Sequence, residues 1–123
     1  MDVYSHVSLE DVDARELEDG APILRSVGID LQPEEMRPSV WEYDAGEENV
    51  FHRQGSQEEL YVVLEGSFDV TIERDDEREV LAVEAGDYLV VPPESWRQLS
   101  AREPSRVLVV GAPNVADDGI VED

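Results

Sequence analysis

The sequence predicts an all-β domain, a sandwich or barrel of short strands, and three observations lead to this class. Runs of Val, Leu, Ile and Tyr recur along the chain, separated by Gly- or Pro-containing turn signals every ~8–12 residues. Residues 67–73 alternate apolar and polar side chains, as expected for a strand with one buried face. Hardly any segment carries the apolar period of an amphipathic helix.

The predicted elements follow one another at short intervals. The first clear strand is expected over residues 22–29, followed by a helical turn or loop over 32–36 and a second strand over 38–43. Trp41 and Tyr43 face the same side of that second strand. Further strands are expected over 50–54, 59–64, 67–73, 80–83, 88–91, 96–99 and 106–110.

Two of these runs, 59–64 and 88–91, are apolar almost throughout, the profile of strands buried on both faces. Gly46, Gly66 and Gly86 stand at the turns between strands. We interpret these glycines as turn positions that need a positive φ, not as parts of a chemical site.

At 123 residues the chain has the length of one domain, with an N-terminal arm expected over 1–19, a barrel over 20–113 and an acidic tail over 114–123. The tail is expected to be disordered. No apolar run approaches the ~18–20 residues that a membrane span needs, and no signal-peptide pattern opens the chain, so we expect a cytoplasmic protein. Without cysteine, disulfides and thiolate ligands are excluded.

The charge is strongly one-sided. Nine basic side chains, all of them arginine, stand against 31 acidic ones and give a net charge of −22. At ~1 M salt the screening length falls to ~3 Å and the self-repulsion largely disappears. The composition resembles that of cytoplasmic proteins from salt-accumulating halophiles. Binding to DNA or RNA is not expected, because neutralising phosphates requires a basic stripe.

A spaced set of residues marks the candidate site. Gly46, His52, Glu59 and Gly66 are separated by five, six and six residues. This spacing resembles the first motif of the cupin family, in which a second histidine usually stands where this chain has Gln54.

A second motif of the same family is matched in part. Gly86 and Pro92 keep its spacing. Glu94 takes the place of the usual glycine, Arg97 that of the histidine and Ala101 that of the asparagine. Two of the four usual metal-ligand positions have therefore changed.

The resemblance covers roughly residues 20–113 and is to a single-domain cupin of the type 2 conserved-barrel kind. It implies a jelly-roll barrel, the double-stranded β-helix, with a site in its mouth. If the strand carrying His52 and Gln54 pairs with the strand carrying Glu59, the three side chains share one pocket.

Three interpretations of that pocket stay open. In the first, His52, Gln54 and Glu59 hold one divalent metal (zinc, manganese, iron or nickel) weakly, because a glutamine carbonyl is a poor ligand and Arg97 is none. In the second, Arg97 forms a salt bridge with Glu59 or Glu58 in a metal-free polar network.

In the third interpretation, Arg97 and Gln54 bind a small anionic ligand between aromatic walls. An arginine is suited to hold a carboxylate or phosphate. Tyr61, Trp96 and Tyr88 are the candidate walls.

The function expected from these residues is binding of a small, anionic ligand, of a weakly held metal, or of both. The alternative is a metal-dependent cupin enzyme, a dioxygenase, isomerase or decarboxylase acting on a small organic acid or sugar. A homodimer is expected, because pairing covers exposed sheet edges, with residues 1–10 or 20–30 as candidate contacts.

Overall fold

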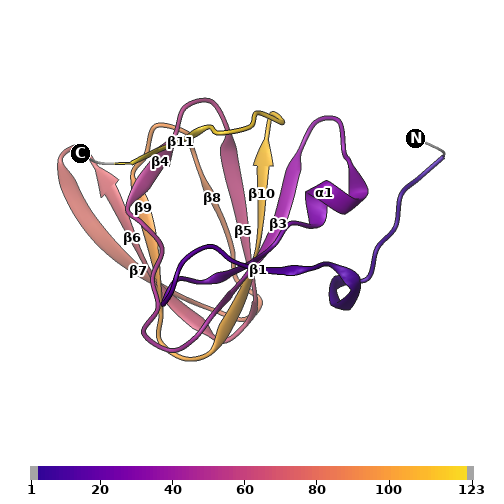
Figure 1. The fold of residues 1–123 in the computed structure, drawn as a ribbon. Coiled ribbons are helices and arrows are strands. Elements are labelled where there is room, and N and C mark those ends of the chain that lie inside the picture. Colours follow the sequence, from indigo (N-terminus) through magenta and orange to yellow (C-terminus); the bar gives the residue numbers. More distant parts are fainter. Residues whose placement is uncertain (1–2, 122–123) are drawn as a thin grey trace.

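The computed structural model describes residues 3–121, except for the Arg74 side chain, as two antiparallel β-sheets packed face to face (Figure 1). The larger sheet has the strand order β1-β2-β3-β10-β5-β8 and the smaller sheet β11-β4-β9-β6-β7. The larger sheet contains β1 (Ala14–Glu16), β2 (Ile23–Arg25), β3 (Arg37–Tyr43), β5 (Glu58–Glu65), β8 (Tyr88–Val91) and β10 (Ser105–Ala112). The smaller sheet contains β4 (His52–Gln54), β6 (Ser67–Arg74), β7 (Glu77–Glu84), β9 (Arg97–Ala101) and β11 (Gly119–Val121).

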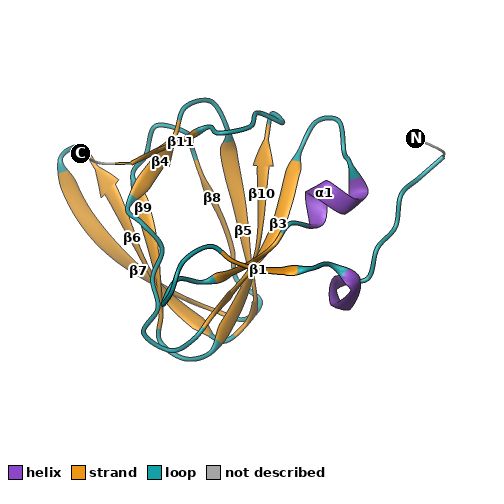
Figure 2. Cartoon of the chain, in the orientation of Figure 1, coloured by secondary structure: helices purple, strands orange, loops and turns teal. Residues whose placement is uncertain are grey.

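Within residues 3–121, helix is confined to two short pieces beside the larger sheet (Figure 2). They are a 3₁₀ turn over Leu9–Asp11 and α1 (Val27–Leu31). The prediction of an all-β jelly-roll barrel is confirmed. Among the described residues no helix is long and apolar enough to cross a membrane.

The core lies between the two sheets and follows the period-two pattern of the strands. Along β10, buried and half-buried residues alternate without interruption. Tyr43 of β3 meets Phe68 of β6 edge to face, with ring centroids 4.9 Å apart. The other buried apolar residues of this core are Tyr61, Val63, Val70, Val83, Val91, Leu99, Ala101, Val107 and Val109.

The glycine interpretation is confirmed, since Gly46, Gly66 and Gly86 all have positive φ. Gly66, between β5 and β6, is the most constrained of the three. At φ +79° a Cβ there would collide with Ser105 Oγ and lie 2.6 Å from Pro104 O.

The pairing expected between the two motif strands is wrong. β4 pairs with β9 and β11, whereas β5 pairs with β10 and β8 in the other sheet. The two strands nevertheless approach each other, because the inner faces of the two sheets meet across the barrel.

Two local expectations near the ends are also wrong. The strand expected over 22–29 stops at Arg25, and α1 follows. Glycine at position 28 lets this helix lie close to β3, since a Cβ there would lie only 3.1 Å from Pro38 O. The tail expected to be disordered instead contains β11, which pairs with β4.

The runs over 59–64 and 88–91 are not buried on both faces in the single chain. Tyr61 is 5% exposed and Val91 1%, but Leu64 is 42% and Tyr88 73% exposed. The inner face of these strands is covered, and the outer face is not.

Candidate functional site

A pocket of about 290 Å³ opens between the two sheets at one end of the barrel. We call it the mouth pocket. Both sheets contribute to it, so the site exists only because the barrel is closed. Its lining residues are Trp41, Tyr43, Asn49, Val50, His52, Gln54, Glu59, Tyr61, Leu99, Val109, Gly119 and Val121.

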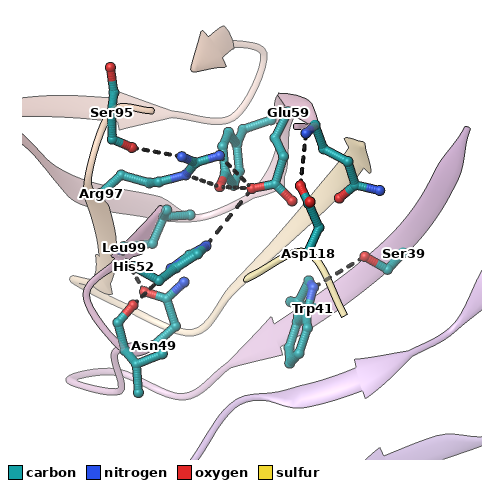
Figure 3. A network of polar contacts seen from close by, with 12 residues as sticks. Ser39, Trp41, Asn49, His52, Glu59, Ser95, Arg97, Leu99 and Asp118 are labelled. Carbon is teal, nitrogen blue, oxygen red and sulfur yellow. Dashed lines mark hydrogen bonds and ion pairs between the residues drawn. The ribbon is translucent and has the colours of Figure 1, made fainter. Parts of the chain in front are cut away.

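A buried carboxylate is the centre of the polar contacts in this pocket (Figure 3). Glu59 Oε1 of β5 accepts a hydrogen bond from Tyr61 Oη at 2.6 Å and from Arg97 Nη2 of β9 at 2.9 Å. Arg97 Nε in turn donates to Tyr61 Oη at 3.2 Å. The three groups form a closed triangle that links the two sheets through the interior.

The Arg97 side chain is buried, and its hydrogen-bond donors are used within the protein. Its side chain is 0% exposed. Besides Glu59 and Tyr61 it donates from Nη1 to Ser95 O at 2.7 Å and to Pro92 O at 3.4 Å. A guanidinium can be buried in this way because its charge is paired and its donors have acceptors.

The contacts of this network shift the pKa values of Glu59 and Tyr61. Burial alone would raise the pKa of Glu59, but the hydrogen bonds from Tyr61 and Arg97 and the charge of Arg97 outweigh it and lower that pKa to about 2. Burial, reinforced by the Glu59 charge, raises the pKa of Tyr61. Near neutral pH Glu59 is therefore a carboxylate and Tyr61 a neutral phenol.

His52 enters from the opposite wall. Its Nδ1 lies 3.0 Å from Val50 O, and since a carbonyl only accepts, Nδ1 carries the proton in the neutral ring. Nε2 then presents a lone pair to the pocket, 3.9 Å from Glu59 Oε1. That separation is too long for a direct hydrogen bond, but it permits an ion pair if the ring is protonated.

Hydrogen bonds fix the loop before β4 and thereby position His52. Asn49 Oδ1 accepts from Leu99 N at 2.8 Å, and Asn49 O accepts from Gln98 Nε2 at 2.9 Å. These bonds anchor the loop to β9, the strand that carries Arg97. The two walls of the pocket are thus fixed relative to each other.

The C-terminal segment closes the side of the pocket next to β4. Asp118 accepts from Ser56 N at 2.9 Å and from Gln57 N at 2.8 Å, and these bonds lower the pKa of its carboxyl group. Gly119 and Val121 of β11 follow and line the pocket.

The structure brings together four of the predicted site residues: His52, Gln54, Glu59 and Tyr61 all line the pocket. Arg97 lies behind Glu59 and is not part of the lining. It therefore does not offer a free guanidinium to a ligand, as the clamp interpretation assumed.

Two predicted aromatic walls lie elsewhere. Trp96 stacks on Phe51, with ring centroids 5.7 Å apart, and Arg53 lies over the Trp96 ring. Tyr88 lies on the outer face of the larger sheet. Consecutive residues of a strand point to opposite faces, so Trp96 cannot share the inward direction of Arg97.

Sequence reasoning missed several lining residues. Trp41 and Tyr43 supply the aromatic walls, and the prediction that they share one face of a strand was a usable signal. Gly119 and Val121 were missed because the acidic tail was expected to be disordered. The apolar residues Ile120 and Val121 were the available signal for a strand there.

The donor set does not fit a tightly held divalent metal. Glu59 already satisfies one oxygen with Arg97 and Tyr61, and Gln54 offers a weak amide ligand. Arg97, at the position usually held by a histidine ligand, has no lone pair and adds a positive charge. Residues 3–121 contain no cluster of three or more His, Asp or Glu side chains placed to hold a metal.

A second cavity, of about 480 Å³, adjoins the mouth pocket along Trp41, Glu59 and Val109. We call it the flanking cavity. It lies beside α1, and Arg37 stands on its wall. Within residues 3–121 the side-chain partner of Arg37 is Asn114 Oδ1, at 3.5 Å, with no carboxylate in ion-pair range.

A model of the cupin domain matches residues 39–111, more than half of the chain, so the protein belongs to the cupin family. KdgF from Halomonas sp. is similar in structure, with 21% identity, a TM-score of 0.79 and coverage of 92% of this chain and 98% of that one. An RmlC-like cupin from Shewanella frigidimarina is 19% identical, with a TM-score of 0.75 and coverage of 95% and 96%.

Oxalate decarboxylase from Bacillus subtilis is also similar, with 19% identity and a TM-score of 0.79. The match covers 94% of this chain and 31% of that one. At these identities the likeness shows the shared fold. The search of the curated proteins found no match.

Proposed function

We propose that this cupin binds a small organic acid across the mouth pocket and the flanking cavity, without a tightly held metal. One observation carries the proposal: an aromatic-walled pocket adjoins a cavity whose arginine has no carboxylate partner among residues 3–121. The walls suit the body of a ligand, and the arginine suits its charged group.

The uncharged body of the ligand is assigned to the mouth pocket. Trp41, Tyr43, Leu99 and Val109 give it apolar and aromatic walls. A volume of about 290 Å³ lies at the small end of the range for ligand pockets. A single ring or a short chain of carbons fits this space better than a nucleotide or an oligosaccharide does.

The polar groups at the pocket wall are suited to recognition. His52 Nε2 accepts in the neutral ring, and the described residues offer the Gln54 side-chain amide no hydrogen-bond partner. Glu59 and Tyr61 keep fixed protonation states near neutral pH. Neither Glu59 nor Tyr61 is therefore suited to exchange a proton with a ligand near neutral pH.

The acidic group of the ligand is assigned to Arg37 instead of Arg97. Arg97 already donates hydrogen bonds to Glu59, Tyr61 and the carbonyl of Ser95. Arg37 contacts the neutral amide of Asn114 through one long bond and has donors left for a carboxylate. In high salt such a short-range contact keeps most of its interaction energy, whereas long-range electrostatic attraction is screened.

Fluorescence of Trp41 tests this function. A Trp96→Phe background leaves Trp41, which lines both cavities, as the one tryptophan. The probes are carboxylic acids of increasing size, from acetate to naphthoate, each paired with its neutral amide, in multi-molar KCl. We expect saturable quenching, with the best acid binding about tenfold more tightly than its amide.

Matched variants separate the parts of the proposal. Arg37→Gln should remove the preference for the acid, whereas Arg15→Gln, on the exposed strand β1, should keep it. Val50→Phe should block the mouth pocket and weaken both probes, whereas Val80→Phe should not. Equal binding of acids and amides would contradict the role of Arg37, and absence of binding across the panel would contradict the function.

A further inference from the structure

Two acceptors at the pocket wall receive no hydrogen bond from the described part of the chain. Glu59 Oε1 receives the bonds from Tyr61 and Arg97, whereas Glu59 Oε2 receives none (Figure 3). No fully buried side-chain oxygen or nitrogen within residues 3–121 lacks a partner, so Oε2 reaches the open space that Glu59 lines. His52 Nε2 is the second acceptor, since Nδ1 carries the proton of the neutral ring.

Two further side chains of the mouth pocket can donate as well as accept. Gln54 is 7% exposed and Tyr43 4%, yet the Gln54 amide and the Tyr43 hydroxyl have no hydrogen-bond partner among residues 3–121. Burial, reinforced by the charges of Glu47 and Glu59, raises the pKa of Tyr43, so its hydroxyl keeps the proton that it can donate. The pocket therefore offers a ligand both acceptors and donors.

Polar groups buried this deeply restrict what can fill the pocket. A ligand that enters displaces the water that otherwise meets them, and it must supply hydrogen bonds in return. An acceptor that is buried without a donor weakens binding, because its desolvation is not compensated. A purely hydrocarbon body would leave Glu59 Oε2 in that state. The part of the ligand in the mouth pocket therefore carries a polar group of its own.

The kind of polar group follows from what these side chains can exchange. An ammonium group only donates, so it cannot accept from Gln54 or Tyr43. An ether or ketone oxygen only accepts, so it cannot donate to Glu59 or His52. A hydroxyl group does both. The charges lead to the same choice, because Glu59 is already paired with Arg97 at 2.9 Å and a cation would enter without a counter-charge.

The open acceptors result from the positions at which this chain departs from the family pattern. Gln54 and Arg97 stand where histidine ligands are usual, and the set does not fit a tightly held metal. The lone pairs of His52 and Glu59 that a metal would otherwise draw are then available for hydrogen bonds. A ligand hydroxyl can supply the proton for such a bond.

We propose that the ligand is a hydroxycarboxylic acid, whose hydroxyl group lies in the mouth pocket while its carboxylate contacts Arg37. The hydroxyl donates to Glu59 or His52 and accepts from one of the two buried donors. The inference rests on the proposed function, since it takes the binding of an acid as given and adds the group that the mouth pocket selects. Arg37 and Glu59 both line the flanking cavity, so one molecule can contact both.

Matched series of straight-chain acids of increasing length test the proposal. At each length the parent acid is compared with its ω-hydroxy, ω-methoxy and ω-amino derivatives, which differ in one terminal group. Binding is followed by Trp41 fluorescence in the Trp96→Phe background, in multi-molar KCl. At the best length the hydroxy acid should bind about tenfold more tightly than the parent or the methoxy acid. The amino acid should bind no more tightly than the parent.

Variants locate the hydroxyl group within the pocket. Tyr43→Phe and Gln54→Leu each remove a donor and should reduce the preference for the hydroxy acid to about threefold or less, while the parent acid still binds. Tyr88→Phe is the matched control for Tyr43→Phe, because it removes an exposed phenol outside the pocket, and it should keep the full preference. Thermal unfolding of the free variants checks that each is folded.

Failure of this inference can be distinguished from failure of the proposed function. If no acid binds at any length, both are wrong. If acids bind and the hydroxy acid is no tighter than its parent, the hydroxyl group is wrong and the proposed function stands. Tighter binding of the amino acid than of the hydroxy acid would overturn the inference in favour of a cation. A preference unchanged in both Tyr43→Phe and Gln54→Leu would also overturn it.

Discussion

The two sheets of the barrel differ on both of their faces. On the inner side, the larger sheet supplies the acid Glu59 and the aromatic walls, whereas the smaller sheet supplies Arg97 and His52. On the outer side, the middle of β10, β5 and β8 in the larger sheet is apolar, whereas β6 and β9 in the smaller sheet are polar. The inner difference holds the sheets together through opposite charges, and the outer difference leaves Tyr88 and Val90 of the larger sheet exposed.

Strands β6 and β5 illustrate how the two outer faces differ. In β6, polar residues alternate with the apolar core residues Phe68 and Val70, so the outer face is solvated. In β5, apolar residues occupy both faces, so burial of Tyr61 and Val63 leaves Leu60 and Val62 half-exposed. The outer side of β6 is therefore polar, whereas that of β5 stays apolar.

The largest effect is expected from breaking the inner link between the sheets. Arg97→Leu leaves Glu59 buried without its cation and should lower the free energy of unfolding by about 3–5 kcal/mol. Urea denaturation in KCl measures it. Arg102→Leu is the matched control, because Arg102 pairs with Asp69 at 2.6 Å at the surface, where solvent screens the pair and its contribution to stability is small. Equal losses would contradict the structural role of the buried pair.

The same link should appear in the pH dependence of stability. The pKa of Glu59 falls from 4.5 to about 2 on folding, so its stabilisation is fully present above pH 4.5 and is lost as pH falls toward 2. The contribution is about 3 kcal/mol. Unfolding curves of wild type and Glu59→Gln should therefore converge below pH 4.5. If the difference between them stays constant down to pH 2, the lowered pKa is wrong.

A smaller and more local effect is expected at the edge of the smaller sheet. Asp118→Asn should weaken the bonds to the backbone amides of Ser56 and Gln57 and loosen β11. Hydrogen exchange at these two amides should accelerate, with little change in the core. Asp117→Asn is the control, because it removes the neighbouring charge and keeps the anchor. Unchanged exchange in Asp118→Asn would show that β11 is held by other contacts.

Much of the fold followed from the sequence. Alternation in 67–73 and the turn glycines defined strands and hairpins, because these depend on local geometry. The helix α1 was not predictable in this way, since its five residues are too few to show a helical period.

The candidate site was predictable in part. The spacing of His52 and Glu59 placed both in one pocket, although it could not show that they come from opposite sheets. The role of Arg97 depended on which acceptors it meets, and these lie on β5 and in the loop before β9. Strand alternation should have excluded Trp96 once Arg97 was placed inward.

The Glu59–Arg97 pair spans the part of the mouth pocket where the chain has Arg97 in place of a histidine ligand. Calorimetric titration with zinc, manganese, iron(II) and nickel tests directly whether this pocket holds a metal, on chelator-treated wild type and on a Gln54→His, Arg97→His double variant. We expect no stoichiometric binding at micromolar concentration in the wild type and one metal per chain in the variant. One tightly bound metal per wild-type chain, abolished by His52→Ala, would contradict it.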